Sequence, residues 1–287
     1  MLDATKICIL GANGQLGKAL QAQYPGAAAL DSDNLDITDT QAVQSFDWSR
    51  FEIVINAAAY TNVDGAETAE GRIAAWNVNA AAVKNLTYAF RQHKLAAFVH
   101  ISTDYVFDGT QNIHSEEEPL SPLSVYGASK AAGDLLASQL DKHYILRTSW
   151  VIGEGKNFVR TMLGLAEKDV SPSVVDDQIG RLTFTSELVR AIDHLLSTKS
   201  EYGTYNVTNS GESVSWSEIT REIFRLAEKN ELTVTDTSTA EYFAGKEGVA
   251  PRPLQSPLDL SKIQSTGFVS TDWKDDLKLY VQKELNQ

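Results

Sequence analysis

A tyrosine and a lysine four positions apart, Tyr126 and Lys130, have side chains that together can move a proton. In a helix, side chains at this spacing lie on the same face. A phenol ordinarily keeps its proton until about pH 10, and a nearby ammonium favours the phenolate. Such a pair can donate a proton to a carbonyl oxygen, or accept one from an alcohol, near neutral pH. Because the same spacing is common among neighbours on a helix surface, this interpretation depends on the rest of the chain.

Three glycines, Gly11, Gly14 and Gly17, follow a short apolar segment at residues 6–10. The apolar segment is typical of a buried strand, and a stripe of apolar residues that begins at Leu16 indicates a helix. A glycine turn between a strand and a helix N-terminus is where backbone N–H groups receive the pyrophosphate of a dinucleotide. We therefore expect a dinucleotide site at this loop, with a simple tight turn as the alternative.

A second apolar segment ends at Asp31, twenty residues beyond Gly11. An acidic residue at this distance bonds the ribose hydroxyls of the adenosine half of a dinucleotide. Asp31 and Asp33 would repel a 2′-phosphate, and neither a lysine nor an arginine lies beside them. The sequence therefore favours NADH over NADPH as the cofactor without excluding NADPH. A solvated loop carboxylate is the alternative, above all for Asp33.

Further short apolar segments predict a parallel sheet, with strands at residues 6–10, 27–30, 51–55, 96–101 and 143–148. Thr103 follows the fourth of them, and a hydroxyl at the C-terminal end of a central parallel strand lies where such sheets bind ligands. The alanine-rich residues 67–93 indicate a long helix. We expect Asn79 within it to bridge structural partners rather than to carry a proton.

After residue 150 the helices and strands that the pattern predicts are shorter and less regular. We predict an α/β protein with a Rossmann-type doubly wound parallel sheet and a smaller C-terminal α/β substrate domain. The dinucleotide-binding domain would comprise residues 1–150 and part of 173–210, and the substrate domain the remainder of 151–287.

The composition is that of an ordinary globular protein, with 287 residues, 43% hydrophobic and 22% charged. A net charge of -13 argues against nucleic acid or an anionic membrane as a partner, because both require a basic surface. The polar N-terminus, the absence of a long apolar run and the single Cys8 predict a cytoplasmic protein. In this acidic chain Arg252, between two prolines, indicates phosphate recognition or an ordinary loop.

Taken together, the glycine loop, the hydroxyl after the fourth strand and the Tyr126–Lys130 pair resemble the extended short-chain dehydrogenase/reductase superfamily. The catalytic trio of that superfamily is Ser or Thr, Tyr and Lys. Within it the chain resembles the dTDP-4-dehydrorhamnose reductase (RmlD) family over most of its length, from about residue 6 to the final helix. The segments that carry this resemblance are residues 56–61, 102–109, 122–127 and 147–150, together with Arg252 and Pro253.

The resemblance implies a reaction and roles for the trio. A hydride passes from NADH or NADPH to the C4 carbonyl of dTDP-4-dehydro-L-rhamnose, which gives dTDP-L-rhamnose. Tyr126 donates the proton to the C4 oxygen, and Lys130 holds the nicotinamide ribose and lowers the pKa of Tyr126. Thr103 bonds the reacting oxygen.

The resemblance also implies binding residues for the cofactor and the nucleotide sugar. In the family, Thr103 and Asp104 contact the sugar, Trp150 packs on the substrate and Arg252 meets its diphosphate. The cofactor-binding positions are Gly14, Gln15 and Leu16 at the pyrophosphate, Asp36 and Ile37 on the adenine side, and Ala59, Tyr60 and Thr61 along the nicotinamide half.

Several positions depart from related enzymes. Tyr105 stands where a dehydratase carries a glutamate, and the absence of this second acid argues against dehydration as the activity. Ala19 replaces the glutamate through which some family members dimerise around magnesium, and Glu187 cannot build that site alone. We therefore expect a monomer or a weak homodimer without a bridging metal. Residues 180–182 read Gly-Arg-Leu where the family usually has Gly-Ala-Pro, which leaves the geometry of this substrate loop open.

Two other functions are compatible with the same residues. One is a reductase or epimerase that acts on another nucleotide sugar, and it would share every catalytic residue. The other is a regulatory subunit that binds NAD(P) without catalysis. Such proteins tend to lose part of the trio, whereas Thr103, Tyr126 and Lys130 are all present.

Overall fold

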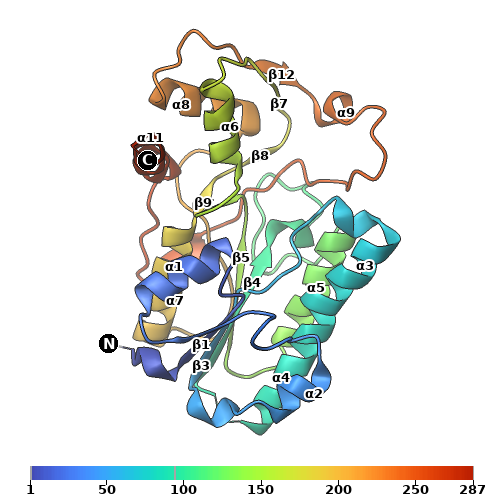
Figure 1. Cartoon of the computed structure of the whole chain (residues 1–287), viewed down its shortest axis with the longest axis vertical. Helices are drawn as coiled ribbons and strands as arrows, with labels where there is room; N and C mark the ends of the chain where they lie inside the picture. Colours follow the sequence, from blue (N-terminus) through green and yellow to red (C-terminus); the bar gives the residue numbers. More distant parts are fainter. Residues whose placement is uncertain (1, 94, 287) are drawn as a thin grey trace.

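The computed structural model describes residues 2–93 and 95–286. At its centre lies a six-stranded sheet in which every neighbouring pair of strands is parallel, in the order β2-β1-β3-β4-β5-β10 (Figure 1). The order reverses between β1 and β3, and open parallel sheets bind ligands at such a reversal. This is the doubly wound sheet expected from the sequence. Its strands are β1 (Ile7–Leu10), β2 (Ala28–Leu30), β3 (Ile53–Asn56), β4 (Ala97–Thr103), β5 (His143–Thr148) and β10 (Gly203–Asn206).

Alternate residues of the strands point to opposite faces of the sheet, and helices cover both faces. Ile7 and Ile9 pack with α1 and α7, whereas Cys8 and Leu10 pack with α2, α4 and α5. Cys8 is a buried core residue, as its apolar surroundings predicted. These helices are α1 (Gln15–Gln23), α2 (Thr40–Ser45), α4 (Ala82–Gln92), α5 (Val125–Ala137) and α7 (Thr185–Thr198).

The long helix expected at residues 67–93 is present but is not uniform. It consists of α3 (Ala69–Trp76), a five-residue π-helical segment (Asn77–Ala81) and α4. Inside the π segment, Asn79 accepts a hydrogen bond from the Tyr60 backbone N–H (2.9 Å) and donates one to the Tyr60 carbonyl (3.1 Å). Asn79 therefore anchors the segment after β3, which is a structural bridge of the kind expected.

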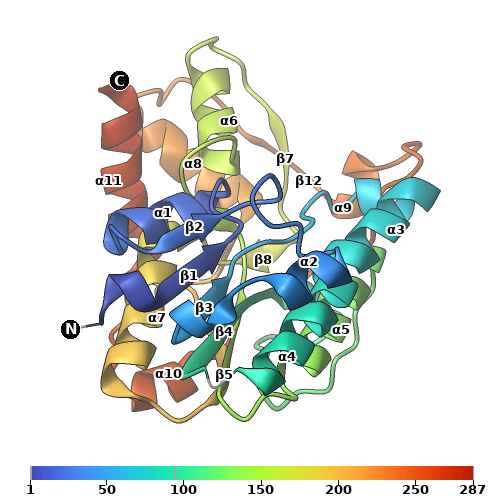
Figure 2. The same ribbon diagram turned by 60° about the horizontal axis from the view of Figure 1, so that its bottom comes forward.

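The C-terminal half forms a further layer, in which α6 (Phe158–Ala166), α8 (Trp216–Leu226) and α11 (Trp273–Leu285) share one apolar core. This layer lies at the upper end of the molecule in both ribbon views (Figure 2). Ser215 and Glu218 form a reciprocal capping box at the start of α8, and Asp272 caps α11. The division into two domains expected from the sequence remains a prediction.

Short elements complete the fold. The strand at Ser173–Val175 was expected from the sequence. The two-residue strands were not expected, because they are too short to show the alternation of apolar and polar residues that indicates a strand. None of the helices among the described residues is both long and apolar enough to cross a membrane. The short elements are β6 (Val151–Ile152), β7 (Ser173–Val175), β8 (Ile179–Gly180), β9 (Thr183–Phe184), β11 (Val214–Ser215), β12 (Thr235–Thr237), α9 (Thr239–Tyr242) and α10 (Ser261–Ser265).

Candidate active site

A cavity of about 660 Å³ lies where the C-terminal ends of the sheet strands meet the C-terminal layer. The glycine loop, the ends of β4 and β5, the first turns of α5 and the segment after β5 all contribute to its wall. Parallel strands bring their C-terminal ends to one edge of the sheet, which is why positions far apart in sequence meet here. The expected site residues that line this cavity are Gly14, Gln15, Leu16, Ala59, Thr61, Thr103, Asp104, Tyr126, Lys130 and Trp150.

The start of α5 positions Tyr126 and Lys130. The Ser124 hydroxyl caps the helix by accepting a hydrogen bond from the Gly127 backbone N–H (3.1 Å), and a Glu67 carboxylate oxygen accepts one from the Val125 N–H (2.9 Å). These caps satisfy N–H groups that lack partners within the helix. Tyr126 and Lys130 are both buried and line the same cavity, so they are not a pair on a solvated helix surface.

Burial dominates the protonation of this pair. It raises the pKa of Tyr126 above its ordinary value, while a hydrogen bond with Thr103 acts in the opposite direction. Burial also lowers the pKa of Lys130 to about 8, and the charge of Asp134 partly offsets this effect. The expectation that the pKa of Tyr126 is lowered is therefore wrong for the protein without its ligands. The raised pKa keeps Tyr126 protonated at neutral pH, which is the state that a proton donor requires.

Thr103 is the last residue of β4, and Asp104 follows it. The Thr103 hydroxyl donates to an Asp104 carboxylate oxygen (3.0 Å) and accepts from the Tyr105 backbone N–H (3.3 Å). Burial raises the pKa of Asp104 to about 6. Within the described residues the second carboxylate oxygen of Asp104 and the hydroxyl of Thr148 lack hydrogen-bond partners. Both residues line the cavity, but these two atoms are buried, and the Ser256 hydroxyl lies close enough to Asp104 to lower the pKa of its carboxyl group.

Two glycines of the loop are required by close packing. A Cβ on Gly11 would lie 2.6 Å from the Ala58 backbone nitrogen, and one on Gly17 would lie 2.1 Å from the Gly11 carbonyl oxygen. Gly14 is the N-cap of α1, and no side chain of the described residues caps this end. The first N–H groups of α1 therefore remain free for an anionic ligand at the wall of the cavity.

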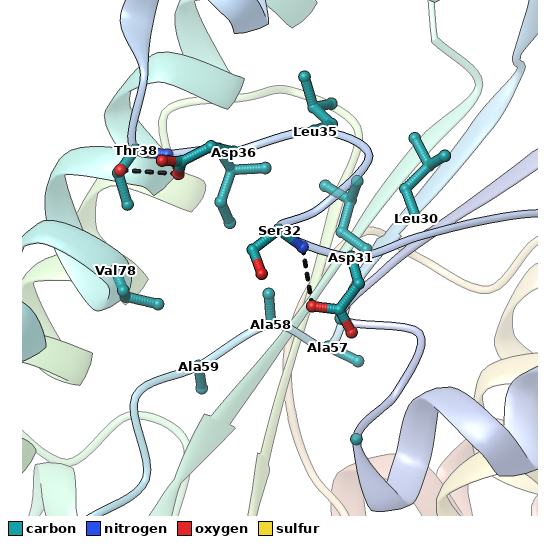
Figure 3. A pocket seen from close by; sticks show the side chains of 14 residues that line it. Leu30, Asp31, Ser32, Leu35, Asp36, Thr38, Ala57, Ala58, Ala59 and Val78 are labelled. Carbon is teal, nitrogen blue, oxygen red and sulfur yellow. Dashed lines mark hydrogen bonds between the residues drawn. The ribbon is translucent and has the colours of Figure 1, made fainter.

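A smaller pocket of about 250 Å³ lies between β2 and the segment after β3 (Figure 3). Asp31, Asp36 and Ile37, expected on the adenosine side, all line it. Asp31 also accepts hydrogen bonds from the backbone N–H groups of Asn13 (2.9 Å) and Ser32 (2.8 Å), so it fixes the glycine loop. Asp33 is exposed to solvent, as its alternative interpretation predicted.

The small pocket and the larger cavity share Gly14, Ala57 and Ala59, so they form one groove that runs from Asp31 to Tyr126. An uncapped helix N-terminus lies beside the middle of this groove, and small alanine side chains form part of its wall. These features fit an extended dinucleotide, with its pyrophosphate at α1 and a flat ring system at either end.

A second cavity of about 460 Å³, mainly aromatic and aliphatic, adjoins the first, because Tyr105 and Trp150 line both. Trp150 has a φ of +48° and stacks on Trp216, with ring centroids 3.7 Å apart. Gly180 packs against the Trp150 ring, where a Cβ would approach to 2.8 Å. Sequence patterns did not identify Trp216, because an aromatic at the start of a helix is most simply a core residue.

Arg252 lines this second cavity from the segment before α10. Its guanidinium donates to an Asp64 carboxylate oxygen (2.8 Å) and to the Ala250 carbonyl (2.8 Å), and lies 4.7 Å from the centroid of the Phe243 ring. A diphosphate that binds here would share Arg252 with Asp64.

Two expected cofactor residues lie in other surroundings. Gly17 packs against the Gly11 carbonyl beneath the loop, so its role is to let α1 approach β1. The Tyr60 side chain packs in a small cluster with Ala66, Ala75 and Tyr126. Contact between Tyr60 and a cofactor would therefore involve its backbone or the edge of its ring.

Glu187 is fully buried, forms an ion pair with Arg190 and accepts a hydrogen bond from the Thr271 backbone N–H (3.1 Å). Its carboxylate is thus occupied by partners within its own chain. Among residues 2–93 and 95–286, no group of three or more His, Cys, Asp or Glu side chains could hold a metal ion. The absence of a metal-bridged dimer remains a prediction.

Comparison with known proteins places this geometry in a family. The model of the RmlD substrate binding domain matches residues 5–286. The dTDP-4-dehydrorhamnose reductase of Aggregatibacter actinomycetemcomitans is 39% identical, over 95% of this chain and 97% of that protein. The chain belongs to the RmlD family. The resemblance deduced from its motifs is thereby confirmed.

Solved structures of family members have the same fold. A dTDP-4-dehydrorhamnose reductase from Clostridium acetobutylicum superimposes with a TM-score of 0.89 at 37% identity, covering 98% of this chain and 99% of that one. The enzyme from Bacillus anthracis, solved in complex with NADP, gives a TM-score of 0.87 at 36% identity, covering 97% and 98%. Other relatives differ in substrate: a probable dTDP-4,6-dihydroxy-2-methyloxan-3-one 4-ketoreductase from Streptomyces antibioticus is 36% identical over 94% of this chain and 92% of its own length.

Proposed function

We propose that this protein reduces the C4 carbonyl of dTDP-4-dehydro-L-rhamnose to the alcohol of dTDP-L-rhamnose, with NADH or NADPH as the reductant. The observation that carries the proposal is the meeting of Thr103, Tyr126 and Lys130 in one cavity that continues into the dinucleotide groove. When bound, the reduced nicotinamide supplies the hydride, and the protein supplies orientation and a proton.

Each member of the trio has a separate task in this reaction. The Tyr126 phenol, kept protonated by burial, donates its proton to the C4 oxygen as negative charge develops there. The Thr103 hydroxyl, which has one proton to donate, would turn from the Asp104 carboxylate to give that oxygen a second hydrogen bond. Lys130 uses one of its three N–H groups on the Ile101 carbonyl and has two left for the nicotinamide ribose and the phenolate.

The nucleotide sugar would enter between the two cavities. Its sugar would lie beside Trp150, Thr103 and Asp104, and its nucleotide would extend into the 460 Å³ cavity toward Arg252. In this arrangement the cofactor is bound mainly by residues 1–150 with part of 173–210, and the nucleotide by the remainder of 151–287. Nucleotide sugars and reduced nicotinamides are cytoplasmic metabolites, so we expect the reaction in the cytoplasm.

We infer a preference for NADH from Asp31, whose carboxylate lines the adenosine pocket and would repel a 2′-phosphate. NADPH remains a usable cofactor in this proposal, because a family member binds NADP. We also infer a monomer or a weak homodimer, since Glu187 is occupied by Arg190 and Ala19 cannot bind a metal.

Reduction of another dTDP-4-keto sugar is the second candidate function. A relative from Streptomyces niveus, 36% identical over 76% of this chain, is a dTDP-4-keto-6-deoxy-D-glucose reductase. The same trio would serve both reactions, and the substrate contacts near Trp150 would distinguish them.

Turnover with purified substrates tests the proposal. The protein would be incubated with dTDP-4-dehydro-L-rhamnose or dTDP-4-keto-6-deoxy-D-glucose and with NADH or NADPH, and loss of nicotinamide absorbance would be followed. We expect the highest kcat/KM with the first sugar and NADH. Preference for the second sugar would establish the alternative, and no turnover with any combination would refute both.

A further inference from the structure

Four buried polar side chains lie one helical turn beyond Lys130, between α5 and the strands that it covers. They are His100 and Ser102 on β4, Asp134 on α5 and Arg147 on β5, and each has an exposure of 6% or less. Ionisable groups are seldom buried to this extent without a partner. The cluster lies next to the proton donor pair, yet the proposed reaction gives it no task.

Arg147 is the ion-pair partner of Asp134. Its Nε donates to one Asp134 carboxylate oxygen (3.1 Å), and its Nη1 donates to the Glu116 carbonyl (3.0 Å). The other Asp134 oxygen, Oδ1, forms no hydrogen bond of normal geometry with the described residues. Burial raises the pKa of the Asp134 carboxyl group, whereas the charges of Arg147 and Lys130 and the nearby Ser102 hydroxyl act in the opposite direction and favour the carboxylate. One oxygen of Asp134 is thus neutralised by Arg147, and the other faces groups on β4.

His100 faces the same oxygen in its neutral form. The Ala58 backbone N–H binds the Asn56 amide oxygen (3.2 Å), which turns the Asn56 amide nitrogen toward His100 Nδ1 (3.2 Å). Since that nitrogen donates, His100 Nδ1 accepts and the ring proton resides on Nε2. Nε2 lies 3.9 Å from Asp134 Oδ1. Burial lowers the pKa of His100 well below its usual range, so the ring carries no charge that competes for Asp134.

Lys130 is the remaining cation close to Asp134. The two residues are four apart on α5, which places them on one face of the helix. Lys130 is almost completely buried, and its ammonium forms a hydrogen bond with a backbone carbonyl rather than with a carboxylate. A charge this deeply buried is costly unless an opposite charge lies nearby. The charge of Asp134 raises the pKa of Lys130 against the effect of burial, and the charge of Lys130 in turn helps to lower the pKa of His100. Tyr126 on the same helix and Asp104 after β4 line the same cavity as Lys130.

We propose that Asp134 is a positioning residue for the proton donor pair, whose buried carboxylate keeps Lys130 charged while Tyr126 gives up its proton. Arg147, His100 and Ser102 hold this carboxylate in place from the two strands. The effect of Asp134 on catalysis rests on the proposed reaction, whereas its effect on Lys130 exists in the protein without any ligand. Those two effects are measured separately.

The first measurement is the pH dependence of folding stability in Asp134→Asn without cofactor or substrate. As the pKa of Lys130 is lowered to about 8, wild-type stability rises with pH above that value, because the unfolded chain then holds a proton that the folded chain has lost. We expect this rise to begin roughly one pH unit lower in the variant. Asp193→Asn is the matched control, since it removes a remote carboxylate bonded to Tyr24 (3.1 Å) and should leave the onset unchanged.

The second measurement is the pH profile of kcat. In Asp134→Asn the loss of activity at high pH should move down by the same roughly one unit, and Asp134→Glu should restore it. If Asp134→Asn fails to fold because Arg147 loses its partner, the double variant Asp134→Asn/Arg147→Met removes both charges and should show the same shift.

The outcomes separate the two proposals. A lower kcat at all pH values with an unchanged high-pH limb, and an unchanged stability onset, would show that Asp134 is a structural residue and would overturn the inference. A shifted stability onset in a protein that turns over neither dTDP-4-keto sugar would support the inference about Lys130 and refute the proposed reaction.

Discussion

The Lys130 ammonium donates a 2.6 Å hydrogen bond to the carbonyl oxygen of Ile101, two residues before the end of β4. This bond ties helix α5 to the strand that carries Thr103. The lysine is therefore fixed by the sheet before any ligand binds, and two of its N–H groups stay available at the cavity. A ribose hydroxyl and the Tyr126 oxygen are the partners that the proposed reaction provides.

Replacing Tyr126 by phenylalanine removes the proposed proton donor and leaves the shape of the cavity intact. We expect kcat to fall by roughly 100-fold or more, in line with the loss of general acid catalysis, and binding of the reduced cofactor to be unchanged. Initial rates and a fluorescence titration with NADH would measure the two effects. Tyr24→Phe, which alters a distant tyrosine bonded to Asp193, should retain full activity. Full turnover by Tyr126→Phe would exclude it as the donor.

Asp31 and Asp33 provide a matched test of cofactor choice. Asp31 lines the adenosine pocket and Asp33 is exposed. Asp31→Ser should raise the ratio of kcat/KM with NADPH to that with NADH, because it removes a negative charge beside the site of the 2′-phosphate. Asp33→Ser should leave the ratio unchanged. An equal change in both variants would mean that general surface charge, rather than contact with the ribose, sets the preference.

Gly17 and Gly14 have different roles in the loop, and alanine substitutions should separate them. A Cβ at position 17 would collide with the Gly11 carbonyl at 2.1 Å, whereas one at position 14 would lie 3.3 Å from the same atom. Gly17→Ala should therefore lower the Tm and weaken cofactor binding. Gly14→Ala should mainly raise the KM for the cofactor, since its methyl group lies on the wall of the groove. Calorimetry and initial rates would measure the two effects, and an unchanged Tm in Gly17→Ala would contradict the packing role.

At neutral pH, the buried Lys130 should lower the free energy of unfolding. Between its folded pKa of about 8 and its ordinary value of 10.5, the unfolded chain binds a proton that the folded chain does not, so wild-type stability rises with pH in this window. Lys130→Met lacks this rise. We expect its gain in unfolding free energy over wild type to be largest near pH 7 and to shrink toward pH 10, as measured by urea denaturation. A gain that does not vary with pH would show that Lys130 titrates normally.

Much of the sheet and part of the site could be predicted because the signals are local. The strand at residues 143–148 was predicted with the bounds that β5 has, and the glycine loop follows β1 as expected. Trp216 could not be found in this way. Its contact with Trp150 joins segments that are 66 positions apart, and the stacking depends on Gly180 making room for the ring.

The amino-acid sequence by itself determined the order of strands and helices, the glycine loop and the spacing of Tyr126 and Lys130, because each depends on residues close together in the chain. The tertiary structure decided what is buried. It raised the pKa of Tyr126, lowered that of Lys130, and paired Asp134 with Arg147 close enough to Lys130 for its charge to offset part of that lowering. Those effects depend on desolvation, and desolvation is set by the way β4, β5 and α5 pack together rather than by any one segment.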